Sequence, residues 1–192
     1  MSVSADGTRA PPHRETARVF FALWPPKEIA RQLAGIAADF SQAAGGRPTR
    51  CETIHLTLAF LGDVAVERLP ELLRVAKEVH AAAFDLTLDR FGVWQHNHLF
   101  WAGCASPPAL LDLADTLSKR LLEAGLAAAD AKRPFVPHVT LVRKLVRLDV
   151  ALPAAQALTF HCGAFVLVRS RLSDKGSAYE VLARFPLAAS QR

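Results

Sequence analysis

The sequence predicts an α+β fold, because its expected strands and helices follow one another irregularly and several neighbouring strands have the pattern of hairpin partners. A doubly wound parallel sheet would instead need a regular alternation of strand and helix. The chain has 192 residues, of which 51% are hydrophobic and 21% charged. That length and composition are typical of one domain, or of two closely packed lobes, with a hydrophobic core.

Local patterns predict the individual elements. Short apolar runs and alternating apolar and polar residues indicate strands, whereas apolar residues three and four positions apart indicate helices. The first strand, over residues 18–24, ends at Pro25-Pro26, and these prolines begin a helix. A loop with glycine and proline over 41–50 precedes a strand that Gly62 ends. In chain order we expect strand 18–24, helix 27–40, strand 53–61, helix 67–80, strands 84–88 and 98–102, helix 107–124, and strands 138–144, 158–171 and 179–185.

The N-terminal residues, the cysteines and the net charge restrict the class of protein and the kind of partner that we expect. Residues 1–17 are polar and are expected to be a disordered tail, with residues 18–192 forming a single domain, and no apolar run reaches the ~18 residues of a membrane span. Cys51, Cys104 and Cys162 form no C-x-x-C pair, which argues against disulfides and fits a reducing cytoplasm. The net charge of +5 favours a phosphate-bearing or otherwise acidic partner.

One short motif occurs twice. His-Leu-Thr-Leu begins at His55 and His-Val-Thr-Leu begins at His138, both on expected strands. Because side chains alternate between the faces of a strand, His55 and Thr57 point one way while the leucines beside them point the other, and the same holds for His138 and Thr140. Each strand therefore offers one imidazole and one hydroxyl to the same surface.

Two histidines at one cleft suit in-line displacement at a phosphodiester. A neutral imidazole removes a proton from the nucleophile and an imidazolium protonates the leaving oxygen, with no metal required. The hydroxyls of Thr57 and Thr140 can hold phosphate oxygens, and Arg143 is the nearest candidate to neutralise the transition state. Strict alternation from His138 puts Arg143 on the opposite face, so it reaches the phosphate only if the strand bulges or ends near Leu141 or if its stem curls round.

These motifs and their flanking residues resemble the 2H phosphoesterase superfamily, in its RNA 2′,3′-cyclic phosphodiesterase branch, also called 2′-5′ RNA ligase or LigT/ThpR-like. The resemblance runs over residues 18–187 and includes Arg-Val-Phe-Phe-Ala-Leu from Arg18, His-Leu-Thr-Leu-Ala-Phe-Leu-Gly from His55 and Pro-Phe-Val-Pro-His-Val-Thr-Leu-Val-Arg from Pro134. Residues 168–172 and 179–183 are similar to the closing hairpin of the family. An aromatic residue that often precedes the first motif is absent at Arg50-Cys51-Glu52, which concerns base stacking and not the chemistry.

The resemblance implies a bilobal α+β fold with two antiparallel sheets related by a pseudo-twofold, helices on the outside and the active site in the groove between the sheets. It implies metal-independent hydrolysis of RNA 2′,3′-cyclic phosphate to a 2′-phosphomonoester, with a weak reversible 2′-5′ RNA ligase activity and no cofactor. By analogy His55 protonates the leaving 3′ oxygen and His138 activates water. Thr57, Thr140 and Arg143 bind the substrate. The partner is an RNA with a 2′,3′-cyclic phosphate end or a related nucleotide, and a cytoplasmic monomer is expected.

Other interpretations of the sequence remain open. The same groove suits a non-catalytic module that holds RNA ends, or a 2H phosphodiesterase for another cyclic or linear nucleotide phosphoester, such as ADP-ribose cyclic phosphate or an oligoadenylate. His96 and His98 have metal-ligand spacing but no nearby carboxylate or cysteine, so we expect loop histidines and no metal. Two groups remain ambiguous: basic residues that mark either an RNA path or a solvated face (Lys132, Arg133, Arg143, Lys144, Arg147, Arg169, Arg171, Lys175), and tryptophans that either stack on a base or fill the core (Trp24, Trp94, Trp101).

Overall fold

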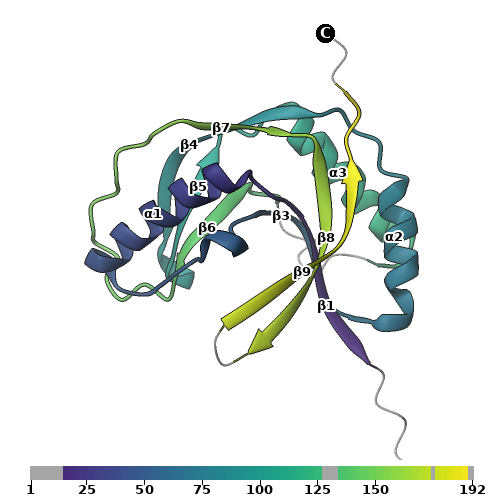
Figure 1. The fold of residues 1–192 in the computed structure, drawn as a ribbon, viewed down its shortest axis with the longest axis horizontal. Coiled ribbons are helices and arrows are strands. Elements are labelled where there is room, and N and C mark those ends of the chain that lie inside the picture. The colour runs from purple at the N-terminus through teal and green to yellow at the C-terminus, as the bar shows by residue number, and fades with distance from the viewer. Residues whose placement is uncertain (1–14, 127–133, 174–175, 190–192) are drawn as a thin grey trace, which may run out of the picture.

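A computed structural model describes residues 15–126, 134–173 and 176–189, and within these ranges the predicted α+β class is confirmed (Figure 1). Short 3₁₀ helices lie at Cys51–Thr53, Val66–Arg68 and Gln95–Asn97. The other elements are β1 (Thr16–Leu23), α1 (Lys27–Ala44), β2 (Arg47–Pro48), β3 (Leu56–Ala65), α2 (Leu69–Lys77), β4 (Phe84–Trp94), β5 (Leu99–Cys104), α3 (Pro108–Glu123), β6 (His138–Arg143), β7 (Leu158–Cys162), β8 (Ala164–Ser173) and β9 (Gly176–Pro186).

The strands form one curled sheet in which all neighbouring strands are antiparallel. Its order is β7-β4-β5-β6-β3-β1-β8-β9, and β2 pairs with β6 beside this path. The expected two sheets are thus continuous, joined where Leu56 of β3 pairs with Val139 of β6. Leu56–Val139 is the one residue pair of the β3–β6 ladder. Each half has an H-x-T strand at the junction, reached through β1-α1-β3 in one half and β5-α3-β6 in the other.

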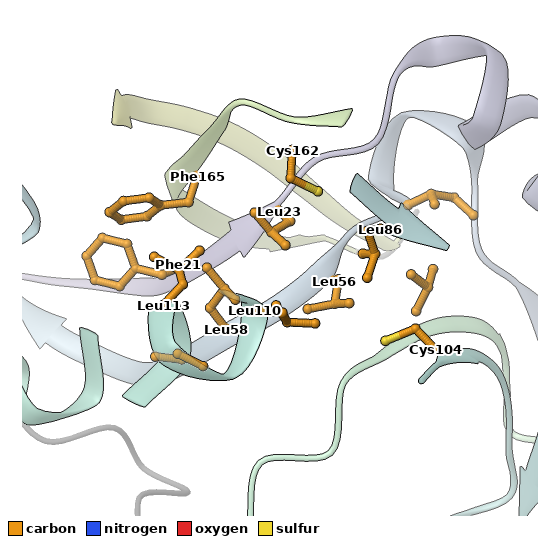
Figure 2. Packing of buried hydrophobic residues seen from close by; sticks show 14 of the residues in the cluster. Phe21, Leu23, Leu56, Leu58, Leu86, Cys104, Leu110, Leu113, Cys162 and Phe165 are labelled. Atoms are coloured by element: carbon orange, nitrogen blue, oxygen red, sulfur yellow. The ribbon is translucent and has the colours of Figure 1, made fainter. Parts of the chain in front are cut away.

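Helices cover one face of the sheet and enclose the main core. The α1 helix begins directly after Pro26, as its prolines predict, and buries Ala30, Leu33, Ala37 and Phe40 at helical spacing. It packs against β6, whereas α3 packs against β3 and α2, so in Figure 1 the helices lie over opposite halves of the sheet. Figure 2 shows the core that results, with side chains from strands of both halves and from α3 (Phe21, Leu23, Leu56, Leu58, Leu86, Cys104, Leu110, Leu113, Cys162 and Phe165).

Several element boundaries differ from the predicted ones. Thr16 and Ala17, expected in the disordered tail, already belong to β1, where Ala17 is buried, while residues 1–14 lie outside the described residues. Gly62 does not end β3, because its positive φ of 75° accompanies a register shift against β1 that the strand absorbs as a bulge. The expected strand over 158–171 is two strands, β7 and β8, which lie in different halves of the sheet on either side of Gly163.

Candidate active site

The junction between the two halves brings the paired motifs together. Leu56 and Val139 are directly opposite each other, and in an antiparallel register this places His55 opposite Thr140 and Thr57 opposite His138. The two histidines are therefore diagonal neighbours, a relation that corresponds to about 7–8 Å between Cα atoms in a regular ladder. In this register the two imidazoles lie on one face of the sheet, each beside a hydroxyl.

Burial of the alternating apolar residues fixes which way the motifs face. Leu56, Val139 and Leu141 are 0% exposed and Leu58 is 6% exposed, whereas the histidines and threonines of both motifs are half-buried. A one-residue slip would turn these four apolar side chains toward water at about 2 kcal/mol each. The total of about 8 kcal/mol is comparable with the whole stability of a domain, so the core itself holds the imidazoles on the opposite face.

Each histidine is oriented by the backbone carbonyl two residues before it. The Nδ1 of His55 lies 2.7 Å from the Thr53 carbonyl oxygen, and the Nδ1 of His138 lies 2.9 Å from that of Val136. A carbonyl only accepts, so in both rings Nδ1 carries the proton and donates it. Nε2 is then the nitrogen that exchanges protons with a ligand. Its lone pair is available as a base in the neutral ring, and its proton as an acid in the imidazolium.

His55 sits in an aromatic enclosure. The Phe20 and Trp24 rings lie 4.8 and 5.5 Å from its ring between centroids, with Trp24 stacked, and Tyr179 of β9 meets its face edge-on at 5.4 Å. Burial among these rings lowers the pKa of His55 from 6.5 to about 4, against the opposing effect of the Thr53 carbonyl. The charges of Arg143 and His138 lower that pKa further, so both side chains are close enough to act on His55 electrostatically.

His138 has a more open environment on the other half of the sheet. Trp94 of β4 meets its ring edge-on with the ring centroids 4.5 Å apart. Burial lowers the pKa of His138, the hydrogen bond to Val136 opposes this, and the charge of Arg143 lowers the pKa further. Trp101 lies beside Trp94, at 5.3 Å between ring centroids, and directly opposite Thr140.

A β-bulge places Arg143 on the same face as the histidines. In the β5–β6 ladder Phe100 is opposite Val142 and Trp101 is opposite Thr140, so Leu141 has no partner. Leu141 and Val142 are both buried, which resets the alternation and returns Arg143 to the face of His138. The same bulge follows the first motif, where Leu58 has no partner in β1 and Phe60 stands at the position that corresponds to Arg143. The Arg18 guanidinium lies over the Phe60 ring, 4.8 Å from its centroid.

Sequence reasoning left the place of the three tryptophans open and missed Phe20 and Tyr179 as neighbours of His55. Trp24, Trp94 and Trp101 are all half-buried on the face of the sheet that carries the motifs, not in the main core. Trp101 lies across two glycines: a Cβ at Gly92 would stand 2.3 Å from its ring, and one at Gly103 2.6 Å. Glycines directly opposite and two residues after a strand tryptophan are a signal that could have predicted a flat ring.

The remaining candidate residues are the histidines at 96 and 98 and the basic residues. His96 lies in a 3₁₀ helix, and the Nδ1 of His98 donates to the Leu145 carbonyl at 2.8 Å. Nowhere in the described part of the chain do three or more His, Cys, Asp or Glu residues gather as metal ligands, and no helix there is long and apolar enough to cross a membrane. Among the basic residues that mark either an RNA path or a solvated face, three form ion pairs: Arg147 with Asp149, Arg169 with Glu15 and Arg171 with Glu180. Lys132, Arg133 and Lys175 lie outside the described residues.

Comparisons with known proteins give matches to this chain in both sequence and fold. Residues 23–101 match the family described as LigT like Phosphoesterase. The chain is 33% identical over 174 residues to an Escherichia coli (strain K12) protein named RNA 2′,3′-cyclic phosphodiesterase, covering 90% of this chain and 98% of that protein. A Thermus thermophilus protein of the same name is 30% identical over 178 residues, covering 88% and 90%. The crystal structure of Escherichia coli LigT with 3′-AMP is similar at a TM-score of 0.82 and 33% identity, covering 90% of this chain and 99% of that one.

Proposed function

The chain belongs to the LigT-like phosphoesterase family, and we propose that it hydrolyses the 2′,3′-cyclic phosphate end of RNA to a 2′-phosphomonoester. The observation that supports this proposal is the Leu56–Val139 pairing, which brings the two H-x-T motifs side by side at the junction of the two halves of the sheet. The names of the relatives support RNA as the substrate class. The cytoplasmic location, the monomer and the reverse 2′-5′ ligase reaction stay predictions.

In the proposed reaction, water attacks phosphorus opposite the 3′ oxygen. His138 takes the proton from water through Nε2, and His55 gives its Nε2 proton to the 3′ oxygen as the bond from phosphorus to that oxygen breaks. The 2′ oxygen keeps the phosphate, and the two imidazoles return to their starting states by exchanging one proton with solvent. Thr57 and Thr140 donate hydrogen bonds to the non-bridging oxygens, and Arg143 faces the charge of the pentacoordinate transition state.

In this scheme the bound substrate has to raise the pKa of His55. With its pKa at about 4, His55 is neutral at pH 7 in the free protein. It becomes the acid only when the negative phosphodiester between the rings raises its pKa. An exchanged assignment, with His55 as the base and His138 as the acid, is the second candidate, and the lowering of the pKa of His55 to about 4 favours it. Both assignments give a bell-shaped pH dependence, because one ring must be neutral while the other is protonated.

The proposal is tested with a nucleoside 2′,3′-cyclic phosphate in excess chelator, followed by identification of the monophosphate isomer. We expect only the 2′-phosphate, and a loss of at least about 100-fold in kcat for His55→Ala and for His138→Ala. The matched control is His161→Ala, since His161 is exposed on β7 and pairs with Asp85 away from the junction. A loss of less than tenfold in His138→Ala contradicts the acid–base mechanism.

The same assay separates the alternative functions. A module that only holds RNA ends would bind RNA in a salt-dependent manner without turnover. An enzyme for another phosphoester would turn over ADP-ribose cyclic phosphate or an oligoadenylate faster than the nucleoside cyclic phosphate. Both alternatives use the same histidines, so the substrate panel, and not mutagenesis alone, distinguishes them.

A further inference from the structure

Two arginines lie directly opposite each other at the edge of the candidate active site. Arg47 of the two-residue strand β2 pairs with Arg143 of β6, and Pro48 pairs with Val142. Residues directly opposite in an antiparallel ladder share one face, with Cβ atoms about 4.5–5.5 Å apart. Because the bulge turns Arg143 toward the histidines, Arg47 lies on that face as well.

The charges of this pair are not compensated within the described residues. Like charges directly opposite each other in a sheet are destabilising. Neither Arg47 nor Arg143 has an ion pair or a side-chain hydrogen bond with a described residue, whereas most other described arginines have a carboxylate partner: Arg18, Arg31, Arg50, Arg68, Arg74, Arg90, Arg120, Arg147, Arg169 and Arg171. Phosphate groups bound at the two guanidinium groups would offset this repulsion.

The backbone around Arg47 is held tightly against β6. The Thr49 N–H donates to the Leu141 carbonyl at 2.7 Å, and a Cβ at Gly46 would stand 2.7 Å from the Arg143 carbonyl oxygen. Gly46 has a positive φ of 96°, so glycine meets both the close approach and the backbone conformation. The end of α1 is fixed as well, since the Ala44 carbonyl accepts the N–H groups of residues 146 and 147. Arg47 therefore projects from a fixed position.

The two arginines differ in their distance from the histidines. Strands β3 and β2 share one edge of β6: β3 meets it at Val139 and β2 meets it at Val142 and Arg143. Along this edge, His55 is opposite Thr140 and Arg47 comes after it, opposite Arg143. The charge of Arg143 lowers the pKa of both His55 and His138, and Arg47 is not among the groups that lower either pKa. Arg47 thus lies one step farther from the reacting centre.

We propose that Arg47 binds the phosphodiester that joins the terminal nucleotide to the preceding one, while Arg143 faces the cyclic phosphate. This proposal rests on the proposed function and adds to it a preference for RNA chains over mononucleotides. A mononucleoside cyclic phosphate has one phosphate and occupies only the site between the histidines and Arg143. A longer RNA end has a second phosphate, and the guanidinium of Arg47 is the next cation along the edge of β6.

The test compares two substrates with the same terminal nucleotide: a nucleoside 2′,3′-cyclic phosphate and a dinucleotide that ends in that cyclic phosphate. For Arg47→Ala we expect kcat/KM to fall about tenfold on the dinucleotide, mainly through KM, and less than twofold on the mononucleotide. The salt dependence of dinucleotide binding should weaken by the contribution of about one contact. Arg47→Lys should restore part of the loss. Arg74→Ala, which removes an exposed cation from α2, is the charge-matched control.

Other outcomes overturn the inference. Equal losses on both substrates would mean that Arg47 acts on the reacting phosphate, and no loss on either would mean that it does not contact RNA. The melting temperature of Arg47→Ala should stay equal to or above that of the wild type, because the variant removes a repulsion. If the wild type hydrolyses neither substrate, the proposed function fails. The inference is then decided by binding of a dinucleotide 3′-phosphate, which Arg47→Ala must weaken more than binding of the corresponding mononucleotide.

Discussion

Acidification should destabilise this protein through His55. Folding lowers the pKa of His55 from 6.5 to about 4, so between these values the unfolded chain binds more protons than the folded one. Stability therefore rises with pH through this window and falls as pH drops below 6.5. The free energy of unfolding falls by about 2 kcal/mol at pH 5 and by about 3 kcal/mol at pH 4, since each pKa unit corresponds to about 1.4 kcal/mol.

The assay is urea denaturation of the wild type and of His55→Asn at pH 7 and pH 5. Asparagine keeps an N–H donor for the Thr53 carbonyl but does not titrate, so the difference between the two proteins isolates the imidazole. The wild type should lose about 2 kcal/mol more than the variant over this range. His161→Asn removes an exposed imidazole and should behave like the wild type. Parallel losses in the wild type and His55→Asn would refute the assignment of a neutral His55 with a lowered pKa.

Two further predictions concern Arg143 and Gly92. Arg143→Ala should lower kcat on mononucleotide and dinucleotide substrates alike by about 10²–10³-fold, because a charge that faces the transition state is lost, and Arg143→Lys should recover part of it. An effect confined to the dinucleotide would contradict this role. Gly92→Ala should lower the free energy of unfolding by about 1–3 kcal/mol and change tryptophan fluorescence, since its Cβ would overlap the Trp101 ring. Gly163→Ala, where the nearest atom is 3.5 Å away, is the control, and equal stability losses in both variants would count against a ring that lies on Gly92.

The alternation within each motif was predictable from sequence because a strand has a local period of two. Leu56 and Val139 are apolar, so His55 and His138 have to point away from the core once those residues are buried. The same local patterns located the three α-helices of the described chain, and proline marked where α1 begins. Glycine was less informative: Gly62 predicted a strand end, but a positive φ is equally compatible with a bulge inside a longer strand.

The sequence by itself therefore determined the chemistry on each of the two strands. Each strand has an imidazole and a hydroxyl on one face, and the apolar residues that alternate with them must be buried on the other face. Only the tertiary structure decided how these groups meet. The pairing of Leu56 with Val139, the unpaired Leu141 that turns Arg143 toward the histidines, and the rings of Phe20 and Tyr179 around His55 all join segments far apart in the chain. Such contacts depend on which strands become neighbours and in which register, and local periodicity carries no information about either.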